Sequence, residues 1–218
     1  MPSSRGVAIF GDVLASRTES TRASRWLRTL TIDLDRTFAA RRMAAFGFTQ
    51  GDELQGLLDA DADPFRVVLR ASLHPDRLPM RWSIGVGAID PGRGPATQRT
   101  GAAFLAAREA INRARSQRDG LIVVTGDPEA DTLLADVAPL FVILLDELTG
   151  RQREIGRLML IEGLRQSDVA DRLRIARPTV SVAVERARLR EIGRLARALK
   201  MMLDSGAGRA VPGGTKAD

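Results

Sequence analysis

The stretch Gly51-Asp52-Glu53 constrains the fold of this chain most strongly, because it separates two apolar runs. Residues 43–48 lead into it and residues 54–58 follow it. Glycine tolerates a positive φ and aspartate hydrogen-bonds its own backbone, so the Gly-Asp pair favours a tight reversal of the chain. The stretch therefore predicts a β-hairpin with acidic side chains at or just after its tip.

The patterns around the hairpin predict an α/β (α+β) domain. Further apolar runs predict strands at residues 6–14, 80–89 and 121–124. Apolar spacings of three and four predict helices at residues 16–42, 63–73 and 101–118. The order favours a ferredoxin-like, palm-type sheet with its helices on one face. Both Trp26 and Trp82 are expected in its core.

This topology brings Asp12, at the end of the first strand, close to Asp52 in the hairpin. Together with Glu53 they suit Mg²⁺ or Mn²⁺, which take oxygen ligands and commonly bridge to phosphates. Four glycines would let a phosphate or ribose approach the backbone: Gly11, Gly51, Gly85 and Gly87. The ordinary alternative is a polar turn with a strand-end aspartate, and the spacing alone leaves both open, with the ordinary one ahead.

Composition excludes several classes of site. The chain has no cysteine and one histidine, which removes thiolate and histidine-cluster metal sites. That residue, His74, precedes a proline and is interpreted as a surface loop residue. No apolar run reaches the roughly 20 residues of a membrane helix, and no signal peptide is recognised, so a cytoplasmic protein without membrane contact is expected.

Charge is concentrated in the C-terminal part. Residues 149–203 hold thirteen Lys and Arg against six Asp and Glu, a net +7, whereas the whole chain carries +6. Such a basic segment beside a near-neutral domain is typical of nucleic-acid binding. The domains expected are residues 1–126 (sheet), 127–148 (apolar connecting helices, broken at Pro139), 149–203 (DNA binding) and 204–218 (a disordered tail).

The basic segment predicts a helix-turn-helix. Thr149 caps a first helix that Gly163 ends, residues 166–173 form a second, and Pro178 opens a third that continues to residue 203. The third helix is the one to place in the major groove of double-stranded DNA. The expected DNA-binding residues on it are Arg177, Thr179, Ser181, Val182 and Arg186. The expected phosphate contacts are Arg151, Arg153, Arg165 and Arg172.

This segment resembles sigma-factor region 4 and LuxR-type modules, in Leu-Thr-x-Arg-Gln, Glu-Gly, Val-Ala-x-x-Leu and Pro-Thr-Val. It departs from them at Arg174, where Gly is usual, and at Arg177, where Ser usually caps. Apolar residues repeat along the end of the third helix, at Ile192, Leu195, Leu199 and Met202. They favour a homodimer that reads paired half-sites, and the apolar connecting helices are a second candidate seam.

Four blocks of the N-terminal part resemble the SatD family, over roughly residues 6–125: Phe-Gly-Asp-Val-Leu-Ala-Ser-Arg from Phe10, Gly-Asp-Glu-Leu-Gln-Gly-Leu-Leu from Gly51, Arg-Trp-Ser-Ile-Gly-Val-Gly from Arg81 and Gly-Ala-Ala-Phe-Leu-Ala-Ala-Arg from Gly101. More distantly they resemble the palm domains of class III nucleotide cyclases and GGDEF proteins. That resemblance implies two metal ions held at Asp12 and Asp52, with Arg17 and Arg108 near phosphates. Leu105 stands where a cyclase has an asparagine, and Arg108 is one place from the expected arginine, so the resemblance favours binding over turnover.

Three functions follow as hypotheses. The first is a DNA-binding transcriptional regulator whose N-terminal domain senses a metal-bound nucleotide. The second is a nucleotidyl cyclase or related two-metal phosphotransfer enzyme. The third is a dimerisation scaffold that binds no ligand.

Overall fold

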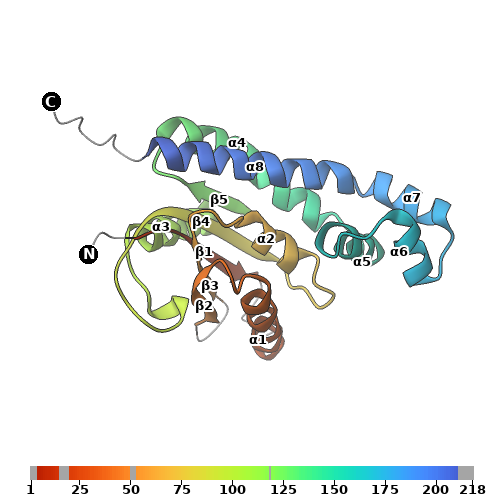
Figure 1. The fold of residues 1–218 in the computed structure, drawn as a ribbon, viewed down its shortest axis with the longest axis horizontal. Helices are drawn as coiled ribbons and strands as arrows, with labels where there is room; N and C mark the ends of the chain where they lie inside the picture. The colour runs from red at the N-terminus through yellow and green to blue at the C-terminus, as the bar shows by residue number, and fades with distance from the viewer. Residues whose placement is uncertain (1–3, 15–19, 50–52, 118, 211–218) are drawn as a thin grey trace.

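One mixed sheet forms the N-terminal part of the computed structural model, which describes residues 4–14, 20–49, 53–117 and 119–210 (Figure 1). Its order is β2-β3-β1-β4-β5. The strands are β1 (Ser4–Val13), β2 (Arg42–Phe48), β3 (Glu53–Asp59), β4 (Met80–Ile89) and β5 (Leu121–Val124). Neighbours pair antiparallel except β4 and β5, which are parallel. The predicted ferredoxin-like arrangement is confirmed, with β5 added beside β4.

Helices cover both faces of the sheet, so the prediction of a single helical face was wrong. The helices are α1 (Ser20–Thr37), α2 (Phe65–Ser72), α3 (Ala102–Gln117) and α4 (Pro128–Asp146). Val7 and Ile9 of β1 share a core with α1, α2 and α4, whereas Ala8 and Phe10 share a second core with α3. The physical reason is visible in β1, whose apolar residues run continuously instead of alternating, as a strand buried on both sides requires.

Helix α4 continues through Pro139, which was expected to break it. Proline removes one backbone hydrogen bond of a helix and crowds the carbonyl four residues earlier. Here that carbonyl belongs to Ala135, which is exposed to solvent. The helix is also held on its inner side, where Leu134, Ala138 and Phe141 are fully buried. None of the described helices is both long enough and apolar enough to cross a membrane.

A cluster of short helices follows at the far end of the molecule (Figure 1). It consists of α5 (Gly150–Gly156), the π-helical turn η2 (Arg157–Ile161), α6 (Gln166–Leu173) and α7 (Arg177–Arg186). A further 3₁₀ turn, η1 (Ala96–Gln98), lies in the loop after β4. The helix predicted at residues 166–173 has the same bounds as α6.

The last helix, α8 (Leu189–Arg209), returns beside α4 toward the sheet (Figure 1). The sequence predicted one helix from Pro178 to residue 203, but Arg188 adopts a left-handed conformation (φ 51°) and separates α7 from α8. The helix also extends six residues past that boundary, into the predicted tail; residues 211–218 lie outside the described structure. Buried Ile192 and Leu199 pack within the chain, which removes them from the predicted dimer seam.

Candidate functional sites at the sheet edge and in the C-terminal helices

Two carboxylates meet at the edge where β1 ends and β3 begins. Asp12 and Glu53 are directly opposite each other in the antiparallel register. Asp12 is only 6% exposed and Glu53 only 5% exposed. Paired strands project opposite residues to the same face, here the face covered by α3. The hairpin thus supplies Glu53 as the neighbour of Asp12, whereas Asp52, Gly51 and Arg17 lie outside the described residues.

Arginines neutralise both carboxylates. Arg115 of α3 donates to Asp12 through Nε (3.1 Å to Oδ2) and Nη2 (2.8 Å to Oδ1), and Nη2 also lies 3.2 Å from Oε2 of Glu53. Arg108 donates to Oε1 and Oε2 of Glu53 at 2.7 and 2.6 Å. Arg81 lies 3.9 Å from Asp12. A paired geometry of this kind is what allows charged groups to be buried.

Other contacts fix the cluster in place. Gln55 donates to Oε1 of Glu53 at 2.8 Å. The Arg108 guanidinium lies 4.5 Å from the centre of the Phe10 ring, a cation–π distance. With three arginines and two carboxylates the set carries a net charge of +1. The cluster of Asp12, Glu53, Arg81, Arg108 and Arg115 is called the acid–arginine cluster below.

The acid–arginine cluster differs from the predicted metal site. Guanidinium groups already bond to the carboxylate oxygens that a cation would need. Among the described residues no group of three or more acidic or histidine side chains is arranged to hold a metal. A cation at this edge would have to displace arginine from Asp12 or Glu53.

The glycines expected to admit a nucleotide serve packing instead. A Cβ on Gly85 would lie 2.4 Å from the carbonyl oxygen of Ala103, and one on Gly87 would lie 2.9 Å from the Ala103 nitrogen. On the opposite face, a Cβ on Gly11 would lie 2.7 Å from Met80. Close packing of α3 on β4 therefore requires Gly85 and Gly87, and side chains of β4 crowd Gly11, so protein atoms occupy the space predicted for a ligand.

The sequence motifs indicated Arg108 as a site residue but not Arg115 or Arg81. One signal for Arg115 was available, since residues seven apart on a helix lie two turns along the same face. Arg108 and Arg115 have that spacing on α3. The exposed Leu105 lies on the same helix and takes no part in the cluster.

Local capping signals set the first of the C-terminal helices. Thr149 and Gln152 form a capping box in which each side chain accepts from the other's backbone N–H. Gly163 has the positive φ, 72°, that ends the following turn. At the start of the next helix, α6, the Asp168 side chain accepts from the Arg165 N–H at 3.2 Å.

The turn between α6 and α7 contains Arg174, which stands where glycine is usual. Arg174 adopts φ 54° and ψ 47°, the left-handed conformation that glycine usually supplies. The N-cap residue of α7 is Ala176, whose side chain cannot accept a hydrogen bond. The turn between α6 and α7 thus forms without the two local signals that are usual in a helix-turn-helix. Tertiary packing of Val169, Val180 and Val184, all buried, holds it.

Helix α7 presents the predicted DNA-binding residues to solvent. They are all exposed: Arg177, Thr179, Ser181, Val182 and Arg186. Val180 and Val184 face the core. Arg165 and Arg172 are exposed on and beside α6, and Arg151 is paired with Glu154 at 2.6 Å.

Arg153 has a structural role instead of the predicted phosphate contact. Its Nη1 donates to the carbonyl oxygen of Leu148. Burial lowers the pKa of its guanidinium, and nearby Arg77 lowers it further. The side chain therefore turns toward the protein and stabilises the start of α5.

The fold and these two sites define an α/β sheet domain of the ferredoxin-like class joined to a basic helical unit. Residues 6–135 match the SatD family profile, and the chain belongs to the SatD family. No curated protein matches its sequence. Residues 136–210, which include α5 to α8, lie beyond the matched range.

Several solved structures show partial similarity to this chain. Two structures of a bacterial light-regulated adenylyl cyclase match with TM-scores of 0.41 and 0.38, at 15% and 14% identity, over 55% and 56% of this chain. In both cases the match spans 43% of the cyclase chain, less than half its length. A regulator of polyketide synthase expression from Bifidobacterium adolescentis matches with a TM-score of 0.28, at 16% identity, over 93% of this chain and 82% of that chain.

Proposed function

We propose that this SatD family protein is a DNA-binding transcriptional regulator that inserts α7 into the major groove. The observation that carries the proposal is the division of α7 into two faces. Val180 and Val184 anchor the helix, while its other face is exposed and holds hydroxyl, guanidinium and apolar groups. Val182 is 45% exposed, and an apolar side chain at such a position suits contact with a thymine methyl.

Uncompensated arginines around α7 support phosphate contacts. Within the described part of the chain, no ion pair engages Arg165, Arg172, Arg174, Arg177 or Arg186. Unpaired exposed cations release counterions from DNA when they bind phosphates, and affinity then falls steeply with salt. Arg151 is a weaker candidate, because Glu154 already neutralises it.

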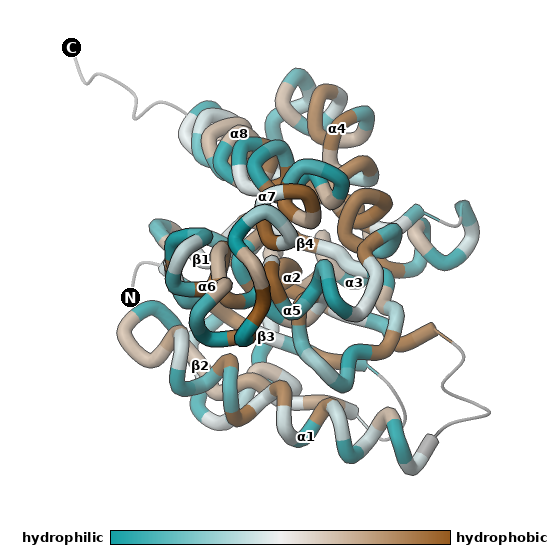
Figure 2. The backbone as a smooth tube through the Cα atoms, turned by 90° about the vertical axis from the view of Figure 1, so that its right-hand side faces the viewer, coloured by the Kyte–Doolittle hydropathy of each residue, from teal (hydrophilic) through white to brown (hydrophobic). Residues whose placement is uncertain are grey.

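A homodimer would form through α4 instead of the predicted seam on the last helix. Leu133 and Leu140 are 50% and 51% exposed. With the partly buried Val137 and Leu144 they repeat at spacings of four, three and four, the pattern of a helix–helix seam. Figure 2 shows apolar colour gathered along α4, whereas α8 beside it is largely hydrophilic. Sedimentation should give a dimer that Leu140→Glu dissociates, and an unchanged mass would contradict this seam.

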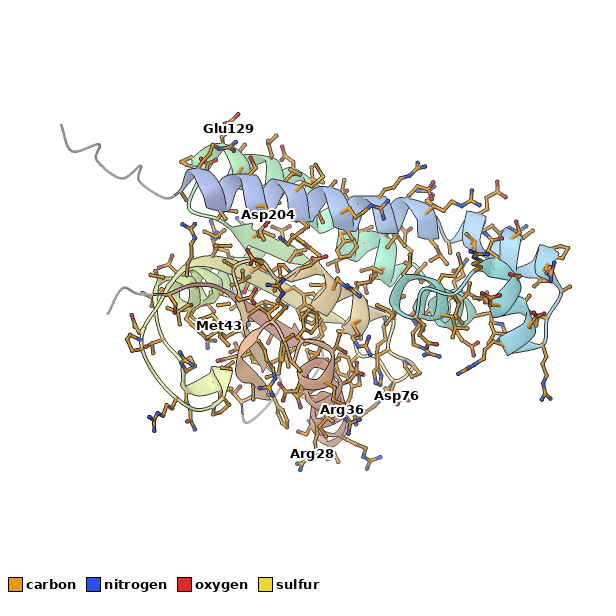
Figure 3. The ribbon with its side chains drawn as sticks, in the orientation of Figure 1. Arg28, Arg36, Met43, Asp76, Glu129 and Asp204 are labelled. Carbon is orange, nitrogen blue, oxygen red and sulfur yellow. The ribbon has the colours of Figure 1, made fainter. Side chains whose placement is uncertain are left out.

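Charge complementarity favours a second copy as the partner of α4. The acidic residues of α4 include Glu129, labelled in Figure 3, and the helix has no basic residue. The exposed face of α8 carries Arg190, Arg194 and Arg197. An antiparallel pairing of two α4 helices would bring the acidic α4 of one copy toward the basic α8 of the other.

Mobility-shift assays test DNA binding directly. The full chain would be titrated with DNA from upstream of its own coding sequence and with selected random DNA at several salt concentrations. Arg172→Ala should lower affinity for all sequences and reduce the salt slope by about one. Val182→Ser should change sequence preference, by about 1 kcal/mol or more at one base position.

The matched control is Arg113→Ala, which removes an exposed arginine of α3 in the sheet domain. It should leave affinity unchanged. If no DNA binds even at low salt, or if Arg172→Ala and Val182→Ser both bind like the parent, the regulator proposal is wrong and the scaffold hypothesis gains.

A second proposal is that the acid–arginine cluster binds a metal-bound nucleotide, which would replace the ion pairs within the cluster by ion pairs to the ligand. A magnesium triphosphate carries both charges that the cluster contains. Its phosphates would take over Arg108 and Arg115, and its cation would take over Asp12 and Glu53. Calorimetry with ATP and GTP in Mg²⁺ or Mn²⁺ tests this, with Asp12→Asn expected to abolish binding. Cyclic products would favour the enzyme hypothesis, and absence of nucleotide binding would sink both.

A further inference from the structure

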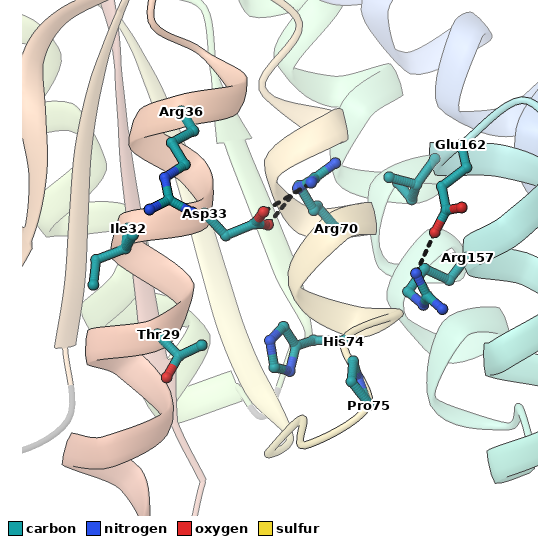
Figure 4. A pocket seen from close by; sticks show the side chains of 10 residues that line it. Thr29, Ile32, Asp33, Arg36, Arg70, His74, Pro75, Arg157 and Glu162 are labelled. Atoms are coloured by element: carbon teal, nitrogen blue, oxygen red, sulfur yellow. Dashed lines mark hydrogen bonds and ion pairs between the residues drawn. The ribbon is translucent and has the colours of Figure 1, made fainter.

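A cavity of about 570 Å³ opens between α1, the end of α2 and η2 (Figure 4). This volume lies within the roughly 300–1,000 Å³ of pockets that enclose small ligands. It is separate from the acid–arginine cluster, which lies on the face covered by α3. None of the residues that line the cavity takes part in the sites described above.

Its walls hold one more cation than anions. Asp33 of α1 accepts two hydrogen bonds from Arg70 of α2, one of them 2.8 Å long between Nη2 and Oδ1. Arg157 pairs with Glu162 on the η2 side. Arg36 remains at the end of α1 with no ion pair among the described residues. The ion-paired walls are therefore neutral, and Arg36 leaves a charge of +1 for a ligand to meet.

His74 adds an oriented donor. Burial lowers the pKa of its imidazole, and the Asp76 carboxylate opposes that only in part, so the ring is neutral at pH 7. Its Nδ1 accepts from the Asp76 N–H at 3.1 Å, which leaves the proton on Nε2. In Figure 4 the ring extends from the end of α2 toward α1, across the cavity.

Apolar side chains provide the rest of the lining. Ile32 of α1 is 49% exposed, although it is a large aliphatic side chain. Pro75 and Ile161 lie on the other walls. A ligand that satisfies all of these groups has one negative charge and an apolar body.

The cavity exists only where the two parts of the chain meet. Arg36 and His74 belong to the part that matches the SatD family, and Arg157 and Ile161 lie beyond it. The η2 turn is π-helical, a geometry found most often at functional sites, and only four residues separate it from α6. A ligand that contacts both α1 and η2 would therefore contact the turn that leads into α6 and α7.

We propose that this cavity binds a small aromatic monocarboxylate, with its carboxylate on Arg36 and its ring between Ile32 and Ile161. Occupancy fixes η2 against α1 and thereby changes DNA affinity. The second statement rests on the proposed function; the first does not.

Calorimetry of the full chain with 1-naphthoate, and with neutral 1-naphthamide as a comparison, tests the site without DNA. We expect saturable binding of the acid and at least tenfold weaker binding of the amide, the effect of one charge-assisted hydrogen bond. Arg36→Ala should weaken naphthoate binding by about tenfold or more. Thr29→Glu, which adds a negative charge at an exposed lining position, should weaken it similarly.

The matched control is Arg28→Ala on the same helix. Arg28 and Arg36 are both exposed residues of α1 (Figure 3), but Arg28 does not line this cavity. It should bind naphthoate like the parent. Equal affinities in all variants, equal affinities for acid and amide, or no saturable binding would each overturn the proposal.

The DNA arm is measured separately. Saturating naphthoate should change the DNA affinity of the parent and leave that of Arg36→Ala unchanged. If naphthoate binds as expected but DNA binding is absent, the proposed function fails and the ligand site stands. If both bind without affecting each other, the coupling is wrong.

Discussion

Arg209, in the last turn of α8, donates two hydrogen bonds to Asp127, the residue that caps α4, through Nε (3.1 Å) and Nη2 (3.0 Å). Asp127 meanwhile accepts from the Ala130 N–H at 2.8 Å. The two residues are 82 positions apart. The contact joins the end of α8 to the start of α4, close to the point where the chain leaves β5.

Close packing at this corner predicts opposite effects for two neighbouring glycines of α8. A Cβ on Gly206 would lie 2.5 Å from the Cβ of Ala130 and 2.7 Å from Oγ1 of Thr125. Gly206→Ala should therefore lower the free energy of unfolding by about 1–3 kcal/mol, as overpacking does. Gly208 has nothing within 4 Å, so Gly208→Ala should raise it by up to about 1 kcal/mol through helix propensity. Urea denaturation measures both, and equal signs would contradict the described packing.

The left-handed arginine before α7 predicts a stabilising substitution. A non-glycine residue in the left-handed conformation destabilises the folded chain by roughly 1–2 kcal/mol. Glycine removes this penalty but loses more conformational entropy on folding, so only part of that free energy is recovered. Arg174→Gly should raise the free energy of unfolding by about 0.5–1 kcal/mol. Arg172→Gly, two residues earlier and inside α6, should lower it by about 1 kcal/mol. Thermal melts distinguish the two, and destabilisation by both would mean that the turn is not left-handed.

The acid–arginine cluster predicts unequal roles for two arginines of α3. Among the described residues, Arg115→Ala leaves the buried Asp12 with only the longer contact to Arg81, so unfolding should become easier by about 1–3 kcal/mol. Exposed Arg113 has no ion pair within the described part of the chain, and Arg113→Ala should change stability by less than about 0.5 kcal/mol. A double-mutant cycle with Asp12→Asn isolates the pair. Additive effects in that cycle would show that Asp12 and Arg115 do not interact.

The single histidine makes one pH dependence easy to isolate. Because the pKa of His74 is lower in the folded chain than the ordinary 6.5, the unfolded chain takes up its proton first as pH falls. This contribution to stability is complete above about pH 6.5 and is lost as pH falls from there through the folded pKa. His74→Gln should flatten the stability profile below about pH 7. An NMR titration midpoint of His74 at or above 6.5 would refute the sign.

Local sequence signals were sufficient for much of the fold. The strand β4, with its two glycines, and the strand β5 have the predicted bounds. So does α6, and Thr149 caps α5 as its spacing indicated. These features depend on residues within a few positions of one another. Trp82 and Trp26 are buried as predicted, since large aromatic side chains are stabilised by burial wherever the topology permits.

The errors arose where distant residues decide. Nothing near Arg188 marks the break between α7 and α8, because an arginine in that position is left-handed only when packing on both sides requires it. Arg115 reaches Asp12 from 103 positions away, so its ion pair with Asp12 was not visible locally. The cavity beside His74 is formed by helices from both parts of the chain, and the sequence suggested only a surface loop there.

The return of α8 along α4 gives the unit of α5 to α7 two attachments to the sheet domain instead of one. The chain leaves the sheet domain through α4, forms α5 to α7, and comes back through α8 to Arg209. The unit from α5 to α7 is thus an insertion at the tip of a helical hairpin, not a module on a flexible linker. A tilt of this unit that carries α8 along would displace α8 against α4, with which it packs. A movement of α5 to α7 would consequently be transmitted through α8 to Gly206 and Thr125, beside the sheet.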